Sequence, residues 1–326
     1  MKNKVTVLVF SLFGFIQMLY GQVTEAESKL RSNDGDTSSG WKKGAIIGLS
    51  LSQASFTNWS SGGQNSFSVN GLFSVYVNYK KGKTEWDNSL DIGYGFLKQG
   101  KNSDYIKTDD RFDFVSKYGR KAFDKFFYAG ILNFKTQMTL GRDYAKDTAK
   151  ISNFLAPAYI IGAVGMDYKP ITYFSAFLAL LTGKLTIVND QDLANAGAFG
   201  VEPAVYDNMG NLIQKGKKSK SEFGGYIRLL FAKNDFKSEI LKNISITSKL
   251  DLFSNYLHRA QNIDISWETL IALQVNKFIN VNINTHLLYD DDIKMAIDSN
   301  GDGVPDRIGP RTQFKEIIGL GITFNF

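Results

Sequence analysis

The sequence contains no cysteine and only five prolines among its 326 residues. The absence of cysteine excludes disulfides, thiolate metal sites and cysteine nucleophiles, so any chemistry must rest on oxygen and nitrogen groups. The shortage of proline is typical of a chain made mostly of strands, because proline removes a ladder hydrogen bond wherever it stands.

Long hydrophobic runs are also missing. The longest uncharged segment near the start, residues 5–19, is shorter than the roughly 18 to 20 residues that a spanning helix needs. Because two lysines precede it, we interpret residues 1–21 as a cleaved signal peptide. Residues 22–40 are polar and rich in Ser, Asp and Gly, which predicts a flexible periplasmic leader. The folded domain is then expected to span residues 41–326.

The sequence also lacks a block of basic residues. The formal charge of +6 is spread along the chain without a basic run. Nucleic acid is therefore not an expected partner.

What the chain does contain is alternation with a period of two. Hydrophobic residues make up 43% and aromatic residues 13% of the sequence. They occupy every second position in successive segments, as in residues 67–79, and the last such segment, 318–326, ends on an aromatic residue. Counting these segments from Ala45 onward predicts twelve strands, with ten or fourteen as the alternatives.

The connections between these strands alternate between short and long. Outer-membrane barrels have short periplasmic turns and long outer loops, so this alternation predicts an even strand number with both termini in the periplasm. The predicted turns are residues 80–83, 119–124, 169–170, 233–243 and 276–278, and the predicted outer loops are 52–64, 98–109, 141–157, 183–221, 255–261 and 290–311.

These patterns predict an all-β fold, a transmembrane antiparallel up-and-down β-barrel of about 12 strands in the outer membrane. A β-sandwich would also show alternating strands. Here, however, the faces opposite the apolar ones carry charges of both signs on nearly every strand. We therefore expect outer-membrane lipid and the barrel-insertion machinery as partners.

The predicted inward faces collect charged residues of both signs. One interpretation is pairing across a narrow lumen, because buried charges must be matched or hydrated. The other is a pore lining that selects small polar solutes. The predicted lumen-lining residues are Glu85, Asp87, Asp91, Arg111, Asp113, Lys117, Lys135, Arg228, Lys249, Asp251, Asp264 and Glu268.

One segment near the end matches the first nine positions of a calcium-binding loop. Asp298, Asn300, Asp302 and Asp306 would supply oxygen ligands, with a glycine at the sixth position. Position twelve is Gly309 instead of a bidentate glutamate, which predicts weak Ca²⁺ binding at best. The alternative is an acidic, glycine-rich turn, and no cofactor is required by any other motif.

Candidate catalytic residues are scarce. His258 and His286 are the two histidines, and spacing identifies no nucleophile for either. A G-x-S-x-G nucleophile motif is absent. We therefore expect no enzymatic activity.

Several segments together resemble an uncharacterised family of Bacteroidota outer-membrane proteins, a domain-of-unknown-function family. They are W-K-K-G from Trp41, S-Q-A-S-F-T-N-W-S-S-G-G-Q-N-S-F from Ser52, K-T-D-D-R-F-D-F from Lys107, L-N-F-K-T-Q-M from Leu132 and L-T-G-K-L-T-I-V from Leu181. The resemblance implies an outer-membrane β-barrel and transfers no catalytic residue.

Two functions are compatible with these expectations. The first is a narrow or partly plugged pore for small polar solutes. The second is a non-catalytic subunit or scaffold of a larger envelope assembly. In that case the apolar residues of the longest loop, 183–221, would form a folded cap, a plug or a docking surface for envelope protein partners.

Overall fold

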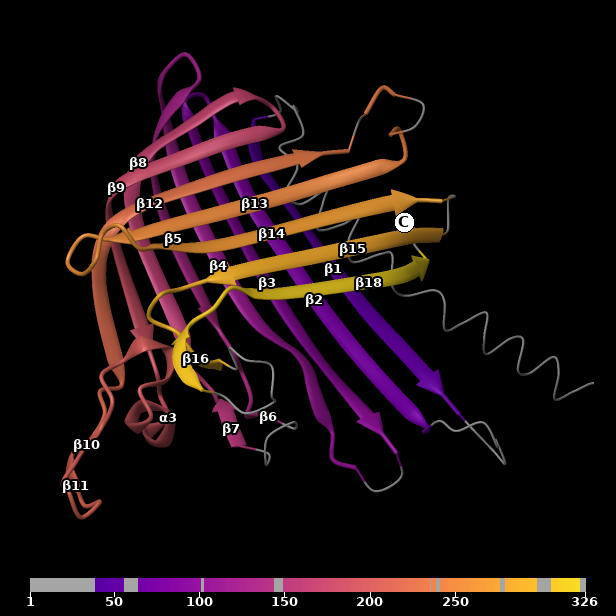
Figure 1. The fold of residues 1–326 in the computed structure, drawn as a ribbon. Coiled ribbons are helices and arrows are strands. Elements are labelled where there is room, and N and C mark those ends of the chain that lie inside the picture. The colour runs from indigo at the N-terminus through magenta and orange to yellow at the C-terminus, as the bar shows by residue number, and fades with distance from the viewer. Residues whose placement is uncertain are drawn as a thin grey trace, which may run out of the picture.

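A single curled sheet of twelve strands forms the body of the protein (Figure 1). The computed structural model describes residues 39–55, 64–100, 103–143, 149–234, 236–238, 241–275, 279–297 and 306–322. Every pairing between neighbouring strands of the sheet is antiparallel. In order across the sheet the strands are β1 (Gly40–Ala54), β2 (Ser66–Lys81), β3 (Thr84–Gln99), β4 (Ile106–Phe123), β5 (Phe126–Thr136), β8 (Ala158–Ile171), β9 (Phe174–Ile187), β12 (Ser219–Lys233), β13 (Ile244–Asn255), β14 (Ile263–Gln274), β15 (Ile279–Tyr289) and β18 (Gln313–Ile322).

The spatial order of these strands is their order along the chain. This up-and-down arrangement confirms the predicted fold class and the count of twelve. It also places the strand connections alternately at two ends of the sheet. The turn end holds the connections after β2, β4, β8, β12 and β14. The loop end holds the other connections, and three of them carry smaller elements (Figure 1).

The period-two alternation of the sequence becomes two different faces of the sheet. In β5, Ala129, Ile131 and Asn133 are buried, while Tyr128 and Leu132 at the alternate positions are exposed. Successive side chains of a strand point to opposite faces, so this pattern assigns one face to the interior and the other to the surroundings. The exposed face is apolar and the buried face is mixed.

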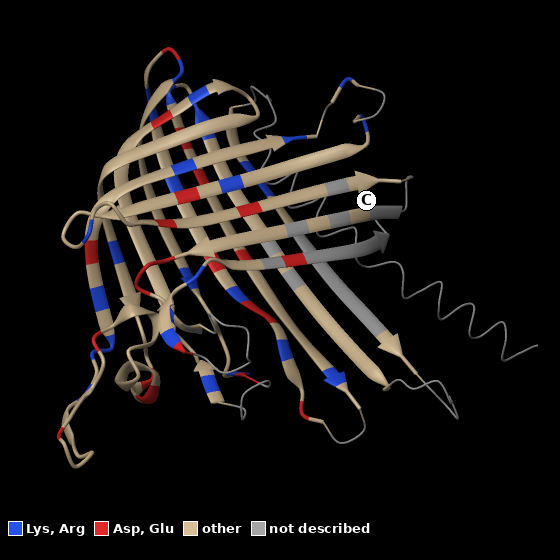
Figure 2. Ribbon diagram, viewed as in Figure 1, with Lys and Arg blue, Asp and Glu red and all other residues tan. Residues whose placement is uncertain are grey.

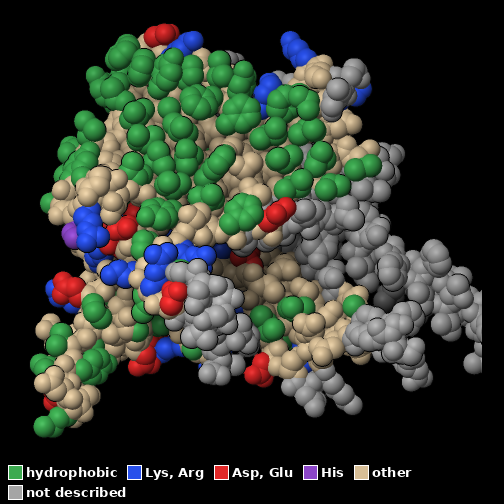
Figure 3. Space-filling model, in the orientation of Figure 1, with side chains coloured by type: hydrophobic (Ala, Val, Ile, Leu, Met, Phe, Trp, Pro, Cys, Tyr) green, Lys and Arg blue, Asp and Glu red, His purple; other side chains and the backbone are tan. Residues whose placement is uncertain are grey.

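The outer face carries the apolar surface expected of a membrane barrel. Figure 3 shows hydrophobic side chains covering much of the viewed wall, whereas charged side chains gather toward the loop end. At the turn end, aromatic rings of neighbouring strands, and one from the turn between β8 and β9, lie against each other. Ring centroids are 4.9 Å apart for Trp41 and Tyr79, 4.6 Å for Phe126 and Tyr168, and 5.7 Å for Tyr173 and Phe231. Such an aromatic row is typical of a barrel's membrane interface.

Strand β9 departs from the predicted boundaries. The predicted turn at 169–170 and the predicted loop from residue 183 leave residues 171–182 for this strand, but β8 continues to Ile171 and β9 runs from Phe174 to Ile187. A register shift on both sides of β9 places an extra residue near Leu180 and Leu181, which are both exposed. Such a β-bulge changes which residues face inward, because it breaks the period of two.

Gly165 of β8 allows the close approach of backbone at this bulge. A Cβ atom at this position would lie 2.0 Å from the Leu178 carbonyl oxygen. No side chain could be accommodated there without moving β9. The glycine is therefore explained by backbone packing.

Residues of the longest connection, between β9 and β12, form a small folded unit, which we call the cap (residues 188–218). Val188, Leu193, Ala194 and Val201 of the cap are buried together with Ala156 from the preceding loop. The cap contains α3 (Gln191–Asn195), η1 (Ala198–Gly200), β10 (Val205–Tyr206) and β11 (Leu212–Gln214); the other loop-end elements are β6 (Gly141–Asp143), β7 (Ala149–Ser152), β16 (Lys294–Ile297) and β17 (Arg307–Pro310).

Strands β1 and β18 stand at the two ends of the strand order. Within the described residues, no pairing joins them. The predicted last strand, 318–326, corresponds to the end of β18, which begins earlier, at Gln313, and pairs with β15. Residues 323–326, the predicted signal peptide and most of the predicted leader lie outside the described residues. Among the described helices, none is long and apolar enough to cross a membrane.

Candidate functional site

A chain of ion pairs, which we call the central bridge, crosses the interior of the barrel. Asp113 of β4 lies directly opposite Lys135 of β5, and Lys249 of β13 lies directly opposite Glu268 of β14. Lys135 Nζ is 3.5 Å from Asp113 Oδ2 and 3.8 Å from Glu268 Oε1. Because β5 and β14 are five places apart in the order of twelve strands, these side chains connect two facing walls.

Further contacts fix both ends of the central bridge. Asn133 Nδ2 donates to Asp113 Oδ1 at 2.7 Å. Glu268 Oε1 lies 3.2 Å from Lys249 Nζ and 3.9 Å from His286 Nε2. Side chains therefore span the interior at this level.

A second buried pair lies beside the central bridge. Arg228 Nε donates to Asp251 Oδ1 at 2.6 Å and Arg228 Nη2 donates to Asp251 Oδ2 at 3.1 Å. Tyr226 Oη donates to the same carboxylate at 2.7 Å. This bidentate arrangement satisfies Asp251 within the wall made by β12 and β13.

Apolar side chains fill the interior next to these charges. Phe177 of β9, which is 1% exposed, packs with Tyr226 and Phe253 in one buried cluster. Ala129, Ile131, Ala163 and Ala179 complete the cluster. This packing narrows the interior on the side formed by β5, β8, β9, β12 and β13.

The turn end of the interior holds alternating charges. Lys169 Nζ lies 2.6 Å from Glu85 Oε2, and Lys80 Nζ lies 3.2 Å from Glu85 Oε1. Asp167 Oδ2 lies 2.8 Å from Lys117 Nζ and 3.7 Å from Lys169 Nζ. Ion pairs thus connect β2, β3, β4 and β8 at this end.

A third group of charges, the loop-end cluster, lies at the loop end of β9, β12 and β14. Lys184 Nζ of β9 is 2.6 Å from Asp264 Oδ2, 3.4 Å from Glu222 Oε2 and 3.7 Å from Asp290 Oδ2. Lys220 Nζ is 3.1 Å from Glu222 Oε1 and also pairs with Asp292. Figure 2 shows how acidic and basic positions are interspersed along these strands.

The structure places the predicted charged residues in these groups as follows. Asp87 lies opposite Lys117, and Asp91 lies opposite Asp113, in the register of β3 and β4. Arg111 and Asp109 lie above Gly93. The central bridge brings together Asp113, Lys135, Lys249 and Glu268; Arg228 and Asp251 form the second pair; Glu85 and Lys117 belong to the turn end; and Asp264 belongs to the loop-end cluster.

Sequence reasoning missed Asp167, Lys169, Lys184 and Glu222. The predicted boundaries put Lys169 in a turn and Lys184 in a loop, because they end β8 and β9 too early. The bulge in β9 is the physical cause for Lys184, because inward positions change from Phe177 and Ala179 to Thr182 and Lys184. The signal that could have revealed it was the pair of apolar neighbours Leu180 and Leu181, which interrupts the alternation.

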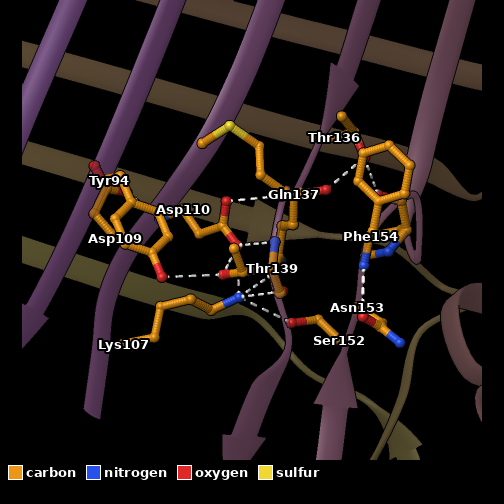
Figure 4. Close-up of polar contacts among 12 residues, drawn as sticks. Tyr94, Lys107, Asp109, Asp110, Thr136, Gln137, Thr139, Ser152, Asn153 and Phe154 are labelled. Carbon is orange, nitrogen blue, oxygen red and sulfur yellow. Dashed lines mark hydrogen bonds and ion pairs between the residues drawn. The ribbon is translucent and has the colours of Figure 1, made fainter. Parts of the chain in front are cut away.

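A hydrogen-bonded node at the loop end explains two of the motifs noted in the sequence (Figure 4). Lys107 Nζ donates to Asp110 Oδ2 at 2.8 Å, to Gln137 Oε1 at 3.0 Å and to the Thr139 carbonyl at 3.0 Å. Asp110 also accepts hydrogen bonds from the backbone N–H groups of Met138 and Thr139. These contacts join the start of β4 to the segment after β5, which gives the node a structural role.

Of the four predicted calcium ligands, one lies within the described residues. Asp298, Asn300 and Asp302 lie outside the described residues. Asp306 is described, and its backbone N–H donates to the Ile297 carbonyl. Within the part of the chain that the structure describes, no group of three or more His, Asp or Glu side chains could hold a metal ion.

Asp190 fixes the start of the cap. Its carboxylate accepts hydrogen bonds from the backbone N–H groups of Asp192 and Leu193, which makes it the N-cap of α3. Lys150 Nζ and Asn153 Nδ2 donate to it at 2.8 and 2.9 Å. Burial alone would raise the pKa of Asp190, but these hydrogen bonds outweigh it and lower the pKa to about 2.

We expect Asp190→Ala to destabilise the cap by about 1 kcal/mol, the usual cost of losing an N-cap. In the parent protein the lowered pKa means that this stabilisation is complete above the ordinary aspartate pKa of about 4 and is lost as the pH falls toward 2. Limited proteolysis of residues 188–218 at pH 7 would measure the effect.

The matched control for this variant is Asp192→Ala. Asp192 pairs with the same Lys150, but its side chain is 82% exposed, so its loss should change little. Equal cleavage rates for parent and Asp190→Ala would contradict the assigned role.

Comparison with known proteins gives a family match without a function. Residues 51–141 match a family described as "Protein of unknown function (DUF3078)". This supports the predicted resemblance to an uncharacterised family and covers the strands that build the Lys107 node. Among curated proteins, none matches this chain. The translocator domain of the autotransporter NalP from Neisseria meningitidis is similar over 98% of each chain, with 12% identity and a TM-score of 0.30, a level of similarity from which we draw no argument.

Proposed function

We propose that the protein is an integral outer-membrane β-barrel that forms a narrow, partly plugged pore for small polar solutes. The observation that carries the proposal is the central bridge, in which Lys135 approaches Glu268 from the opposite wall at 3.8 Å. Paired charges make an interior that is polar yet too constricted for large solutes.

Membrane location follows from the two faces of the sheet. The outer face is apolar and carries an aromatic row at the turn end, whereas the charges lie inside. The expected signal peptide, periplasmic leader and Bacteroidota origin are consistent with the outer membrane, and the short turns are expected to face the periplasm with both termini. No step of this proposal requires catalysis or a cofactor, and weak Ca²⁺ binding by residues 298–306 remains a separate expectation.

Solute entry into proteoliposomes tests the proposal. Vesicles containing the folded barrel should swell in an isotonic solution of a small solute such as glycine, but not in one of a trisaccharide. Vesicles that received heat-denatured protein serve as the control. Equal swelling with both solutes would contradict the constriction, and no swelling with either would contradict the pore.

A second function, a scaffold or subunit of an envelope assembly, is favoured by one feature of the cap. The hairpin formed by β10 and β11 projects from the loop end (Figure 1). Met209 in its turn is 90% exposed, and Ile213 in β11 is 66% exposed. The turn is held by hydrogen bonds from the backbone N–H groups of Met209 and Asn211 to Asp207 Oδ1. An apolar, fixed projection of this kind suits contact with a protein partner.

The assembly hypothesis can be tested on membranes extracted with mild detergent. If the hairpin binds a partner, Met209→Asp combined with Ile213→Asp should reduce the size of the complex on a native gel while the barrel stays folded. Migration of the parent protein at the size of a single barrel would contradict this function.

A further inference from the structure

The loop-end cluster contains more acidic than basic groups. Lys184 and Lys220 share contacts with four carboxylates, so the cluster has a formal charge of −2 at neutral pH. The nearby Asp291 does not change this balance, because Arg259 Nη1 lies 3.5 Å from it. The four carboxylates are Glu222, Asp264, Asp290 and Asp292.

The charges deeper in the interior are close to balanced. In the central bridge and the adjacent pair, three cations face three carboxylates, and Asp91 of β3 and Arg111 of β4 beside them add one charge of each sign. At the turn end, Lys80, Lys117 and Lys169 face Glu85, Asp87 and Asp167. The negative excess is therefore concentrated at the loop end, although the whole chain carries a formal charge of +6.

The excess negative charge of the loop-end cluster lies where it can act on ions that enter the interior. Glu222 is 5% exposed and Lys184 is 8% exposed, so these charges lie within the wall and are poorly screened by solvent. Asp290 and Asp292 follow the end of β15, where the interior meets the outer loops. In water at physiological salt, a net charge of −2 attracts a cation and repels an anion that lie about 8 Å away. The local ratio of cation to anion concentration is then raised about fourfold.

We propose that the pore prefers cations over anions and that the loop-end cluster sets this preference. The inference rests on the proposed pore function and adds the class of solute that it passes. A cation entering from the loop end meets carboxylates in excess of the lysines that pair with them. An anion meets a repulsive entrance, because both lysines are already engaged.

The reversal potential of single channels in a KCl gradient tests this preference. For the parent protein we expect potassium to be about fourfold more permeant than chloride. Asp290→Asn combined with Asp292→Asn removes both excess charges and should bring this ratio close to one. Asparagine at position 290 keeps the Oδ1 atom that accepts a hydrogen bond from the backbone N–H of residue 292, so the loop geometry is preserved.

Two further variants keep the test informative. Asp264→Asn removes one charge from the strand side and should lower the ratio by about half, which provides a second route if the double variant folds poorly. Glu202→Gln removes one charge from an exposed ion pair with Lys217 in the cap and should leave the ratio unchanged.

The outcomes separate this inference from the proposed function. Open channels with a potassium-to-chloride ratio of one or less would overturn the cation preference while leaving the pore intact. A ratio above one that is unchanged in both the double variant and Asp264→Asn would overturn the role of the cluster. Folded barrels without any conductance would overturn the pore and, with it, this inference.

Discussion

Replacing Lys135 and Glu268 together by alanine is expected to raise the single-channel conductance roughly threefold, because it removes the contact that spans the barrel. The double substitution removes one positive and one negative charge, so the net charge of the interior is unchanged. Asp113 keeps its hydrogen bond from Asn133, which limits the structural disturbance. The expected increase is therefore a consequence of width and not of charge.

A matched control uses an ion pair that does not cross the interior. Lys217 and Glu202 lie 2.8 Å apart in the cap and are both more than half exposed. Replacing both by alanine should leave the conductance unchanged. An unaltered conductance in the Lys135 and Glu268 double variant would show that the central bridge is not the constriction.

Replacing Arg228 by methionine is expected to lower the free energy of unfolding by about 3 kcal/mol. Arg228 supplies two of the hydrogen bonds that satisfy Asp251, and both side chains are only 12% exposed. Without the guanidinium, a carboxylate is left in the packed wall beside Phe253 and Tyr226 with much less compensation. Denaturant unfolding in detergent, followed by tryptophan fluorescence, would measure the loss.

The combined replacement Arg228→Met and Asp251→Leu distinguishes lost charge compensation from lost packing. Removing both charges should recover most of the stability, because a buried pair often contributes little more than apolar residues of similar volume. Tyr226→Phe, which removes one hydrogen bond to Asp251, should cost about 1 kcal/mol. A double variant that is as unstable as Arg228→Met alone would contradict the ion-pair explanation.

The sequence predicts the wall of this protein much better than its interior. Alternation and the lengths of connections are local properties, so they suffice for twelve strands, their antiparallel order and the outward faces of segments such as β5. The bulge at Leu180 and Leu181 is set by packing against β8 and β12. Local alternation therefore placed the end of β9 too early and left Lys184 in a loop.

Partners within the interior could not be deduced for a different reason. Asp113 and Lys135 become neighbours through strand register, and Lys135 meets Glu268 only because the sheet curls until β5 faces β14. Both conditions are long-range. The sequence predicts that these side chains face the interior. It does not predict which of them pair, that Glu222 is among them, or that carboxylates are in excess at the loop end, and these features are visible only in the structure.

The most direct test of the central claim is the single-channel conductance of the purified, folded parent protein in a planar bilayer. A constriction made by the central bridge predicts discrete steps that are smaller than those of a sixteen-stranded porin in the same membrane and salt. Steps as large as those of the wide porin, or no steps from correctly folded protein, would contradict the account.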